Sequence, residues 1–146
     1  MVFALLLICG VAVWNLKPAP TRPVSRLMIT LPPGDQLAAL DYPAIAISPD
    51  GTQLVYAAIH SGTQQIFLRA LDSIETRPLP NTEGANTPFF SPDGRWVGFF
   101  AGNKLKKVSV GGGIAVSLAD ALQPRGASWG SPGMIIFAPT SISTLL

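Results

Sequence analysis

The stretch PFFSPDGRWVGFFAGNKLKKVSVGGG, which runs from Pro88 to Gly113, decides the fold class of this chain. Its tetrapeptide Ser91-Pro92-Asp93-Gly94 suits a tight turn, because proline presets φ at the second position, aspartate tolerates the third and glycine fits the fourth. Apolar runs flank the turn on both sides, which predicts a β-hairpin. Further strand-like runs follow at Lys104 to Val110 and at Ile114 to Leu118, separated by three glycines.

The same turn occurs 43 residues earlier, as Ser48-Pro49-Asp50-Gly51, and its apolar flanks are repeated too. A weaker third copy, which lacks the aspartate, follows at a spacing of 39 residues and includes Trp129 to Phe137. We attribute the shorter second period to a loop, because Ser61 to Gln64 has no counterpart after Asn103. Two more strand-like runs complete the first copy, at Gln65 to Leu71 and Thr76 to Leu79. Four strands in a period of about 40 residues are typical of a β-propeller blade.

The repeats predict an all-β fold with about two complete four-stranded blades and part of a third, near residues 42–84, 85–126 and 127–146. The 122 residues from Ser25 to Leu146 hold fewer than three periods, whereas propellers close with about 4 to 8 blades. We therefore expect a partial propeller over residues 25–146, whose open edges and faces favour self-association. Arg26 to Thr30 would pair into the last blade of a complete ring. Four aromatic residues are expected in blade interiors or contacts between blades: Tyr56, Phe89, Phe99 and Phe100.

The N-terminal segment is apolar, since residues 1–16 carry no charged side chain and the first charge is Lys17. A membrane-spanning helix needs about 20 apolar residues, and Trp14 and Lys17 suit the interface at its end. We interpret residues 1–17 as a transmembrane helix or signal anchor, and residues 18–24 as a stiff, proline-rich linker. A cleaved signal peptide, a helix that begins upstream of Met1 and a buried apolar segment stay open as alternatives.

Charged and metal-ligating residues are too few to indicate a nucleic-acid or metal site. The formal net charge is only +2, and the one lysine cluster, Lys104, Lys106 and Lys107, suits a solvated strand better than a set of phosphate contacts. A single cysteine and a single histidine, Cys9 and His60, do not supply a metal site. We place His60 at a loop tip, and expect no metal and no cofactor.

No catalytic residue is predicted either. Asp50 and Asp93 are the repeated acids and are interpreted as turn residues, while the other acids form no recognisable pair. The segment Gly126 to Gly130 matches the G-x-S-x-G nucleophile elbow, but that motif requires a helix after the serine, and then an acid and a histidine. No acidic residue and no histidine follow Ser128 in this sequence. The repeat explains the same residues as a strand that enters a hairpin.

The two SPDG turns, the LPPGDQL segment from Leu31 to Leu37 and the Pro88–Gly113 stretch resemble TolB-like, WD-repeat-like β-propellers. In particular, they are similar to the propellers behind the single membrane helix of bacterial receptor-type serine/threonine protein kinases. The resemblance implies a non-catalytic, membrane-anchored binding or sensing module, periplasmic and attached to a cytoplasmic kinase. The kinase motifs themselves are absent from this sequence. The positive charges after the apolar segment favour the opposite orientation.

Two other functions stay open from the sequence. The chain could be the propeller of a prolyl-oligopeptidase-like serine peptidase, whose hydrolase domain would follow it. It could also be a secreted periplasmic TolB-like protein, which requires cleavage near Ala19. As partners we expect the membrane, through residues 1–17, and an unknown protein or small-molecule ligand on the propeller, but no nucleic acid.

Overall fold

The computed structural model describes residues 28–38 and 41–140. The chain divides into two compact units, residues 1–30 and residues 31–146. The expected membrane segment at residues 1–17 and the linker at residues 18–24 lie outside the described residues. No helix within the described ranges is long and apolar enough to cross a membrane. Residues 28–30, the described part of the predicted strand at Arg26 to Thr30, have no regular secondary structure, so the strand is not found there.

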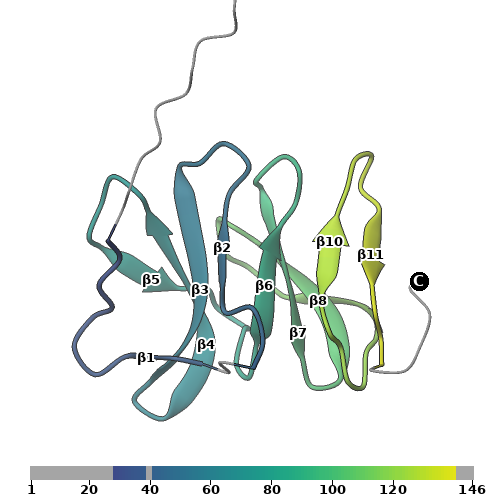
Figure 1. Ribbon diagram of the computed structural model, residues 1–146, viewed down its shortest axis with the longest axis horizontal. Coiled ribbons are helices and arrows are strands. Elements are labelled where there is room, and N and C mark those ends of the chain that lie inside the picture. The colour runs from purple at the N-terminus through teal and green to yellow at the C-terminus, as the bar shows by residue number, and fades with distance from the viewer. Residues whose placement is uncertain (1–27, 39–40, 141–146) are drawn as a thin grey trace, which may run out of the picture. The chain divides into compact units, whose positions relative to one another are not determined.

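The unit formed by residues 31–146 is all-β over its described residues, with antiparallel strands in three sheets (Figure 1). The first sheet, called blade 1, contains β1 (Gln36–Leu37), β2 (Ile45–Ile47), β3 (Gln53–His60), β4 (Thr63–Ala70) and β5 (Thr76–Pro78). The second, blade 2, contains β6 (Asn86–Phe90), β7 (Trp96–Ala101), β8 (Lys104–Ser109) and β9 (Val116–Asp120). The third, called the hairpin, contains β10 (Ala127–Trp129) and β11 (Ile135–Phe137).

The strand orders confirm the predicted repeat and correct two details of it. Blade 2 has the order β6-β7-β8-β9, and the path β2-β3-β4-β5 in blade 1 is equivalent. The four extra residues of the first period lengthen the strands, because β3 and β4 have eight residues each and β7 and β8 have six. They do not form the predicted longer loop. The longer β3 extends beyond β2, and β1 pairs with this extension, so blade 1 gains an unpredicted fifth strand.

The fourth strand of blade 2 begins two residues later than the sequence predicts. We expected a strand from Ile114 to Leu118, and β9 spans Val116–Asp120. The reason is the glycine run, because Gly112 and Gly113 both have positive φ, at 93° and 123°. Such backbone belongs to a turn and delays the start of the extended strand.

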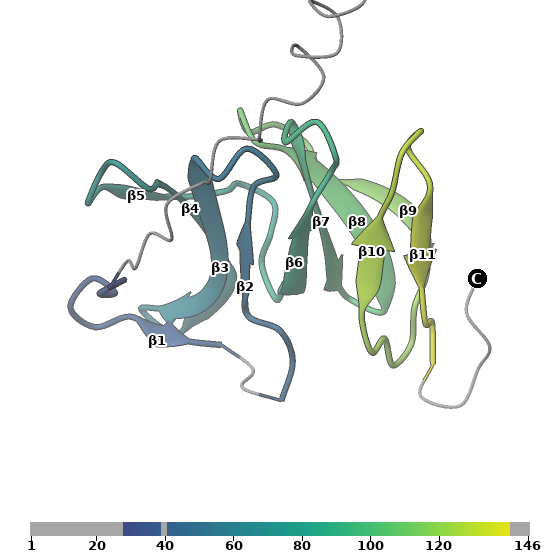
Figure 2. The ribbon, with the colours of Figure 1, turned by 45° about the horizontal axis from the view of Figure 1, so that its top comes forward.

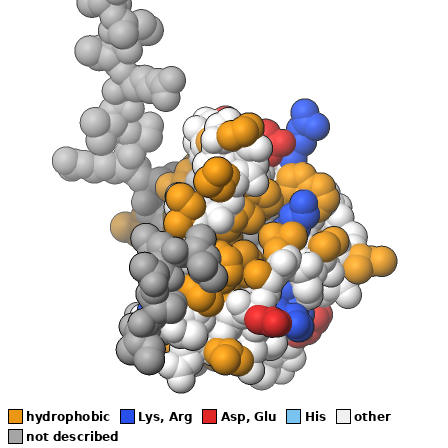
Figure 3. Space-filling model, turned by 90° about the vertical axis from the view of Figure 1, so that its right-hand side faces the viewer, with side chains coloured by type: hydrophobic (Ala, Val, Ile, Leu, Met, Phe, Trp, Pro, Cys, Tyr) orange, Lys and Arg blue, Asp and Glu red, His pale blue; other side chains and the backbone are white. Residues whose placement is uncertain are grey.

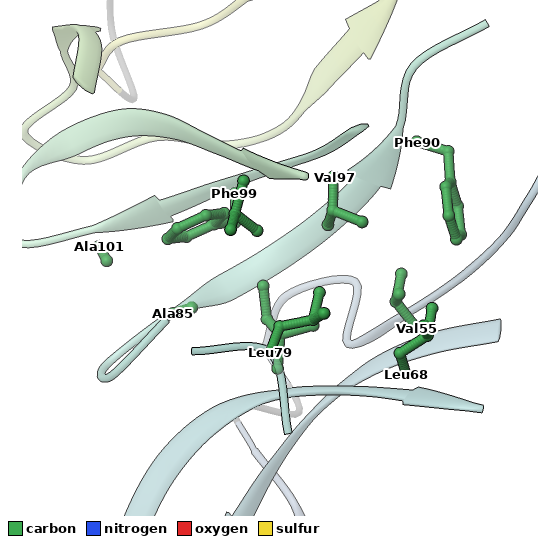
Figure 4. Packing of buried hydrophobic residues seen from close by; sticks show 10 residues of the cluster. Val55, Leu68, Leu79, Ala85, Phe90, Val97, Phe99 and Ala101 are labelled. Carbon is green, nitrogen blue, oxygen red and sulfur yellow. The ribbon is translucent and has the colours of Figure 1, made fainter. Parts of the chain in front are cut away.

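The main core lies between blade 1 and blade 2 (Figure 4). Side chains alternate between the two faces of a strand, and the apolar residues of the facing sides meet here. Blade 1 contributes Val55, Ile66, Leu68 and Leu79, and blade 2 contributes Ala85, Phe90, Val97, Phe99, Ala101 and Val108. β2 and β6 lie side by side in both ribbon views, and they are in contact (Figures 1 and 2). This is the face-to-face stacking of neighbouring propeller blades.

A second core joins blade 2 to the hairpin. Phe100, Leu105 and Ala121 of blade 2 form a buried cluster with Phe137, against which Ala127 and Ile135 also pack. Tyr56, Phe99 and Phe100, predicted in blade interiors or contacts between blades, are at most 2% exposed. Phe89 is partly buried and packs against this second cluster, as expected for a contact between blades.

Candidate functional site

The two SPDG turns share one hydrogen-bonded geometry at the beginning of β3 and β7. Ser48 Oγ donates to Asp50 Oδ1 at 2.5 Å and accepts a hydrogen bond from the Gln53 amide at 2.9 Å. In blade 2, Ser91 Oγ donates to Asp93 Oδ1 at 2.6 Å and accepts from the Trp96 amide at 2.9 Å. Both serines are buried. The tetrapeptides thus form the β2–β3 and β6–β7 turns.

The aspartates of these turns bind their own loops. The Ser48 hydroxyl and the Thr52 amide and hydroxyl all bond to Asp50, and they lower the pKa of its carboxyl below the usual value of 3.8. The Ser91 hydroxyl and the Arg95 amide lower the pKa of Asp93 in the same way. Both carboxylates are therefore ionised at neutral pH. Their bonds to the turns point to a structural role.

Gly94 has the backbone conformation that the turn requires, with φ at +69°. A Cβ at this position would also lie 3.9 Å from Cδ of Pro49, so the two turns are neighbours. Replacing Gly94 with valine is expected to lower the free energy of unfolding by about 1–3 kcal/mol, because β-branched residues are strained at positive φ. Urea denaturation measures this loss.

Gly111→Val is the matched control for Gly94→Val. Gly111 is exposed, has no positive φ, and a Cβ there would meet only Ser109 Oγ at 3.5 Å. We expect this control to change the free energy of unfolding by less than about 0.5 kcal/mol. A loss of only a few tenths of a kcal/mol in Gly94→Val would contradict the turn geometry.

A lysine lies between two tryptophans where blade 2 meets the hairpin. Lys107 Nζ lies 4.6 Å from the ring centroid of Trp96 on β7 and 5.9 Å from that of Trp129 on β10. Phe89 packs edge-on against Trp129, at 6.2 Å between ring centroids. We call Trp96, Lys107 and Trp129 the indole–lysine cluster. All three side chains are partly exposed, and no salt bridge of Lys107 is found among the described residues.

This cluster was missed by the sequence analysis, which interpreted the lysines as a solvated strand. Lys104 fits that interpretation, since it is exposed and pairs with Asp120 at 2.6 Å. Lys107 does not, because it lies on the opposite face of β8, next to Gly98 in the register of β7. The repeat contains a signal for this position. The hairpin of blade 2 is shorter than that of blade 1, and once this is taken into account Lys107 lies as far after the second turn as Leu68 lies after the first. Leu68 is buried, so a residue at the equivalent position is expected to face a neighbouring sheet.

His60 and Asp35 also differ from the prediction. His60 is the last residue of β3 rather than a loop tip, and its Nδ1 lies 2.5 Å from Asp35 Oδ1. The Asp35 side chain is 1% exposed and that of His60 is 52% exposed. The sequence analysis found no such pair, because 25 residues separate the two and β1 was not predicted. The pair fixes the beginning of β1 against the end of β3.

The other candidate residues are not brought into a reactive group. Ser128 lies within β10 and enters a hairpin, without the helix that a nucleophile elbow requires. No group of three metal-ligating residues occurs in the described ranges. Cys9 lies outside them.

Two of the open hollows on the unit are formed by described residues alone. One, of about 340 Å³, is lined by Gln53, Leu68 and Arg77 among others, and the buried Gln53 Oε1 has no hydrogen-bond partner among the described residues. The other, of about 220 Å³, lies beside Tyr42 and Phe100. Such hollows suit a small polar group or part of a peptide rather than a large enclosed cofactor.

Comparison with known proteins gives matches among solved structures. No protein-family model matches the chain, and no curated protein matches it. A protein described as TolB from Agrobacterium tumefaciens is 27% identical with a TM-score of 0.56, over 63% of this chain and 36% of that one. TolB from Acinetobacter baumannii is 21% identical with a TM-score of 0.55, over 70% and 28%. The β-propeller domain of the Trilobed protease from Pyrococcus furiosus is 17% identical with a TM-score of 0.54, over 66% and 34%.

These matches agree with the strand order and the blade stacking. The matched part spans about a third of each of these longer structures. The described part of the chain is accordingly similar in fold to a segment of these TolB structures and of that β-propeller domain.

Proposed function

We propose that this chain is a non-catalytic binding module, in which propeller blades present a surface to a protein or small-molecule ligand. The indole–lysine cluster carries this proposal. Two indoles offer large, rigid and amphipathic contact area, which is enriched at interfaces. Lys107 adds a positive charge that a carboxylate of the partner can approach. The TolB neighbours support an interaction module, and the hydrogen bonds of Asp50 and Asp93 within their turns support a structural role for the repeated acids.

Site-specific photo-cross-linking tests the binding module. A photoreactive phenylalanine analogue replaces Trp96, and Ile74, which is 87% exposed in blade 1, is the matched control position. We expect one recurrent adduct from position 96 and none from position 74. Lys107→Ala should weaken that adduct, while Lys106→Ala should leave it unchanged. Absence of any adduct from position 96, in cells that produce the protein naturally, would contradict a ligand at this cluster.

We further propose that residues 1–17 anchor the propeller at a membrane and that the propeller is periplasmic, as the extracytoplasmic part of a serine/threonine kinase. The apolar sequence of residues 1–16 and the resemblance stated above support this proposal. A prolyl-oligopeptidase-like peptidase and a secreted TolB-like protein are the alternatives. The reading frame around this chain separates the kinase from the peptidase. A kinase catalytic loop upstream would support the kinase, and a hydrolase domain downstream would support the peptidase.

Carbonate extraction tests the anchor. The full chain is expected to sediment with membranes and to stay in the pellet at alkaline pH, because the apolar side chains of residues 1–16 would be buried in the bilayer. A chain that begins at residue 25 is the control and should be released into the supernatant. Recovery of a soluble species that begins near Ala19 or Thr21 would establish a cleaved signal peptide instead.

A further inference from the structure

Blade 1 has an open hollow of about 340 Å³ on the side that faces blade 2. Leu68, which lines it, belongs to the core between the two blades, and Arg77 donates through Nη2 to the Val110 carbonyl of blade 2 at 2.5 Å. Blade 2 is a four-stranded sheet, so the hollow stays open beside a whole neighbouring blade. It does not depend on where the chain ends. The lining consists of Gln53, Leu68, Ala70, Ser73, Glu75, Thr76 and Arg77.

The lining offers both signs of charge and an unused hydrogen-bond acceptor. Glu75 and Arg77 are two residues apart at the beginning of β5, so their side chains leave the same face of the sheet. Glu75 is exposed and forms no salt bridge with another described residue. The bond to Val110 leaves other N–H donors of the Arg77 guanidinium for a ligand. The buried Gln53 Oε1 has no donor among the described residues, and its terminal amide can rotate toward one that enters the hollow.

Hydrogen bonds hold the rim of the hollow in place. The carbonyl of Ser73 accepts a bond from Arg69 Nε at 2.7 Å, and the Ser73 hydroxyl accepts one from the Glu75 amide at 3.0 Å. Arg69 itself is buried. The connection that carries Glu75 is therefore ordered before a ligand arrives, and such preorganisation lowers the cost of binding.

Blade 2 shows that the fold does not require these polar residues. The strand pairing and the repeat align Gln53 with Trp96, Glu75 with Ile114, and Arg77 with Val116. Aromatic or aliphatic residues thus stand in blade 2 where blade 1 has an amide, a carboxylate and a guanidinium. Figure 3, viewed from the side of the hairpin, shows several hydrophobic side chains at the surface among a few charged ones. The polar lining is therefore a property of blade 1 and not of the repeat.

We propose that this hollow binds a zwitterionic molecule of the size of an α-amino acid, with its ammonium group at Glu75 and its carboxylate at Arg77. Both contacts are charge-assisted hydrogen bonds, and Gln53 Oε1 is a second acceptor for the ammonium group. Leu68 and Ala70 form the apolar part of the lining and favour an aliphatic side chain on the ligand. The volume lies near the lower end of the range for small-molecule sites. The proposal rests on the binding module proposed above, whose small-molecule ligand it assigns to a chemical class, and not on the indole–lysine cluster.

Isothermal titration calorimetry of the full chain in detergent, with L-leucine as the probe, tests the proposal. We expect one saturable site. L-Leucinamide lacks the carboxylate and N-acetyl-L-leucine lacks the ammonium group, so each should bind at least about threefold more weakly, because each loses one partly solvated charge pair. Glu75→Gln should weaken the binding of leucine and of leucinamide by a similar factor. It should not weaken the binding of N-acetyl-leucine, which has no ammonium group for Glu75 to contact.

Glu83→Gln is the matched control, because Glu83 is an exposed acid outside the lining, between β5 and β6. It should leave the affinity for leucine unchanged. Gln53→Trp gives blade 1 the residue that blade 2 has at this position, and it should abolish binding because the indole fills the hollow. Thermal melts should show that every variant is folded.

Two results would overturn the proposal. One is the absence of saturable heat from the wild-type chain at leucine concentrations up to about 10 mM. The other is an equal loss of affinity for leucine and N-acetyl-leucine in Glu75→Gln, since the carboxylate would then not face the ammonium group. Neither result would remove the adduct expected from position 96, so a failure here is distinguishable from a failure of the proposed binding module.

Discussion

Replacing Phe99 with alanine is expected to lower the free energy of unfolding by about 3–5 kcal/mol, the largest effect of any single substitution considered for this chain. Phe99 is 0% exposed and belongs to the core between the two blades. Its removal leaves a cavity lined by side chains of both sheets, because Leu79 and Ala85 belong to the same cluster (Figure 4). Close-packed interiors relax only in part around such a cavity.

Urea denaturation, followed by tryptophan fluorescence, measures the effect of Phe99→Ala. Ile74→Ala is the control, since it removes an exposed aliphatic side chain and should cost less than about 0.5 kcal/mol. A loss of less than about 1 kcal/mol for Phe99→Ala would show that this ring is not enclosed between the blades.

Replacing Gly98 with valine is expected to cost about 3 kcal/mol, the upper end of the range for overpacked cores. A Cβ at position 98 would overlap the ring of Phe89, which pairs with Gly98 across β6 and β7. The ring has little freedom to move away, since it packs against Phe100 and Trp129 with centroids 6.4 and 6.2 Å apart. Its displacement would also disturb the indole–lysine cluster.

Blade 1 supplies the compensating change. Ala46 and Val55 occupy there the positions of Phe89 and Gly98, and they pair across β2 and β3. Blade 1 thus has the smaller residue of the pair, Ala46, on its first strand. Blade 2 instead has the large Phe89 on its first strand and glycine on its second. The double variant Phe89→Ala with Gly98→Val should be more stable than the sum of the single losses predicts, by at least about 1 kcal/mol. Strict additivity in this cycle would contradict the contact.

The sequence predicts the blades well because the SPDG turns are local. Serine, proline, aspartate and glycine determine each turn within four residues, and alternating apolar residues determine the strands beside it. β1 is different. Gln36 and Leu37 form a strand only because the longer β3 extends beyond β2 and pairs with them. A segment of two residues has no alternating apolar pattern that could predict this strand. The Asp35–His60 pair was missed for the same reason.

The candidate site could be predicted only in part. The sequence places Trp96 and Trp129 beside the turns of their hairpins. Whether Lys107 lies between them depends on which residues of β8 point toward the β10–β11 hairpin. That face follows from the register between β7 and β8. A one-residue change of register would move Lys107 to the other face. Composition and charge counts do not contain this information.

The central claim is that blade 1 and blade 2 share one core and unfold together. Amide hydrogen exchange of the wild-type chain and of Phe99→Ala, measured by mass spectrometry, tests this claim most directly. We predict that the substitution on β7 lowers the protection of β3 and β4 by the same factor as that of β7 and β8. Loss of protection confined to blade 2, with blade 1 unchanged, would contradict the shared core.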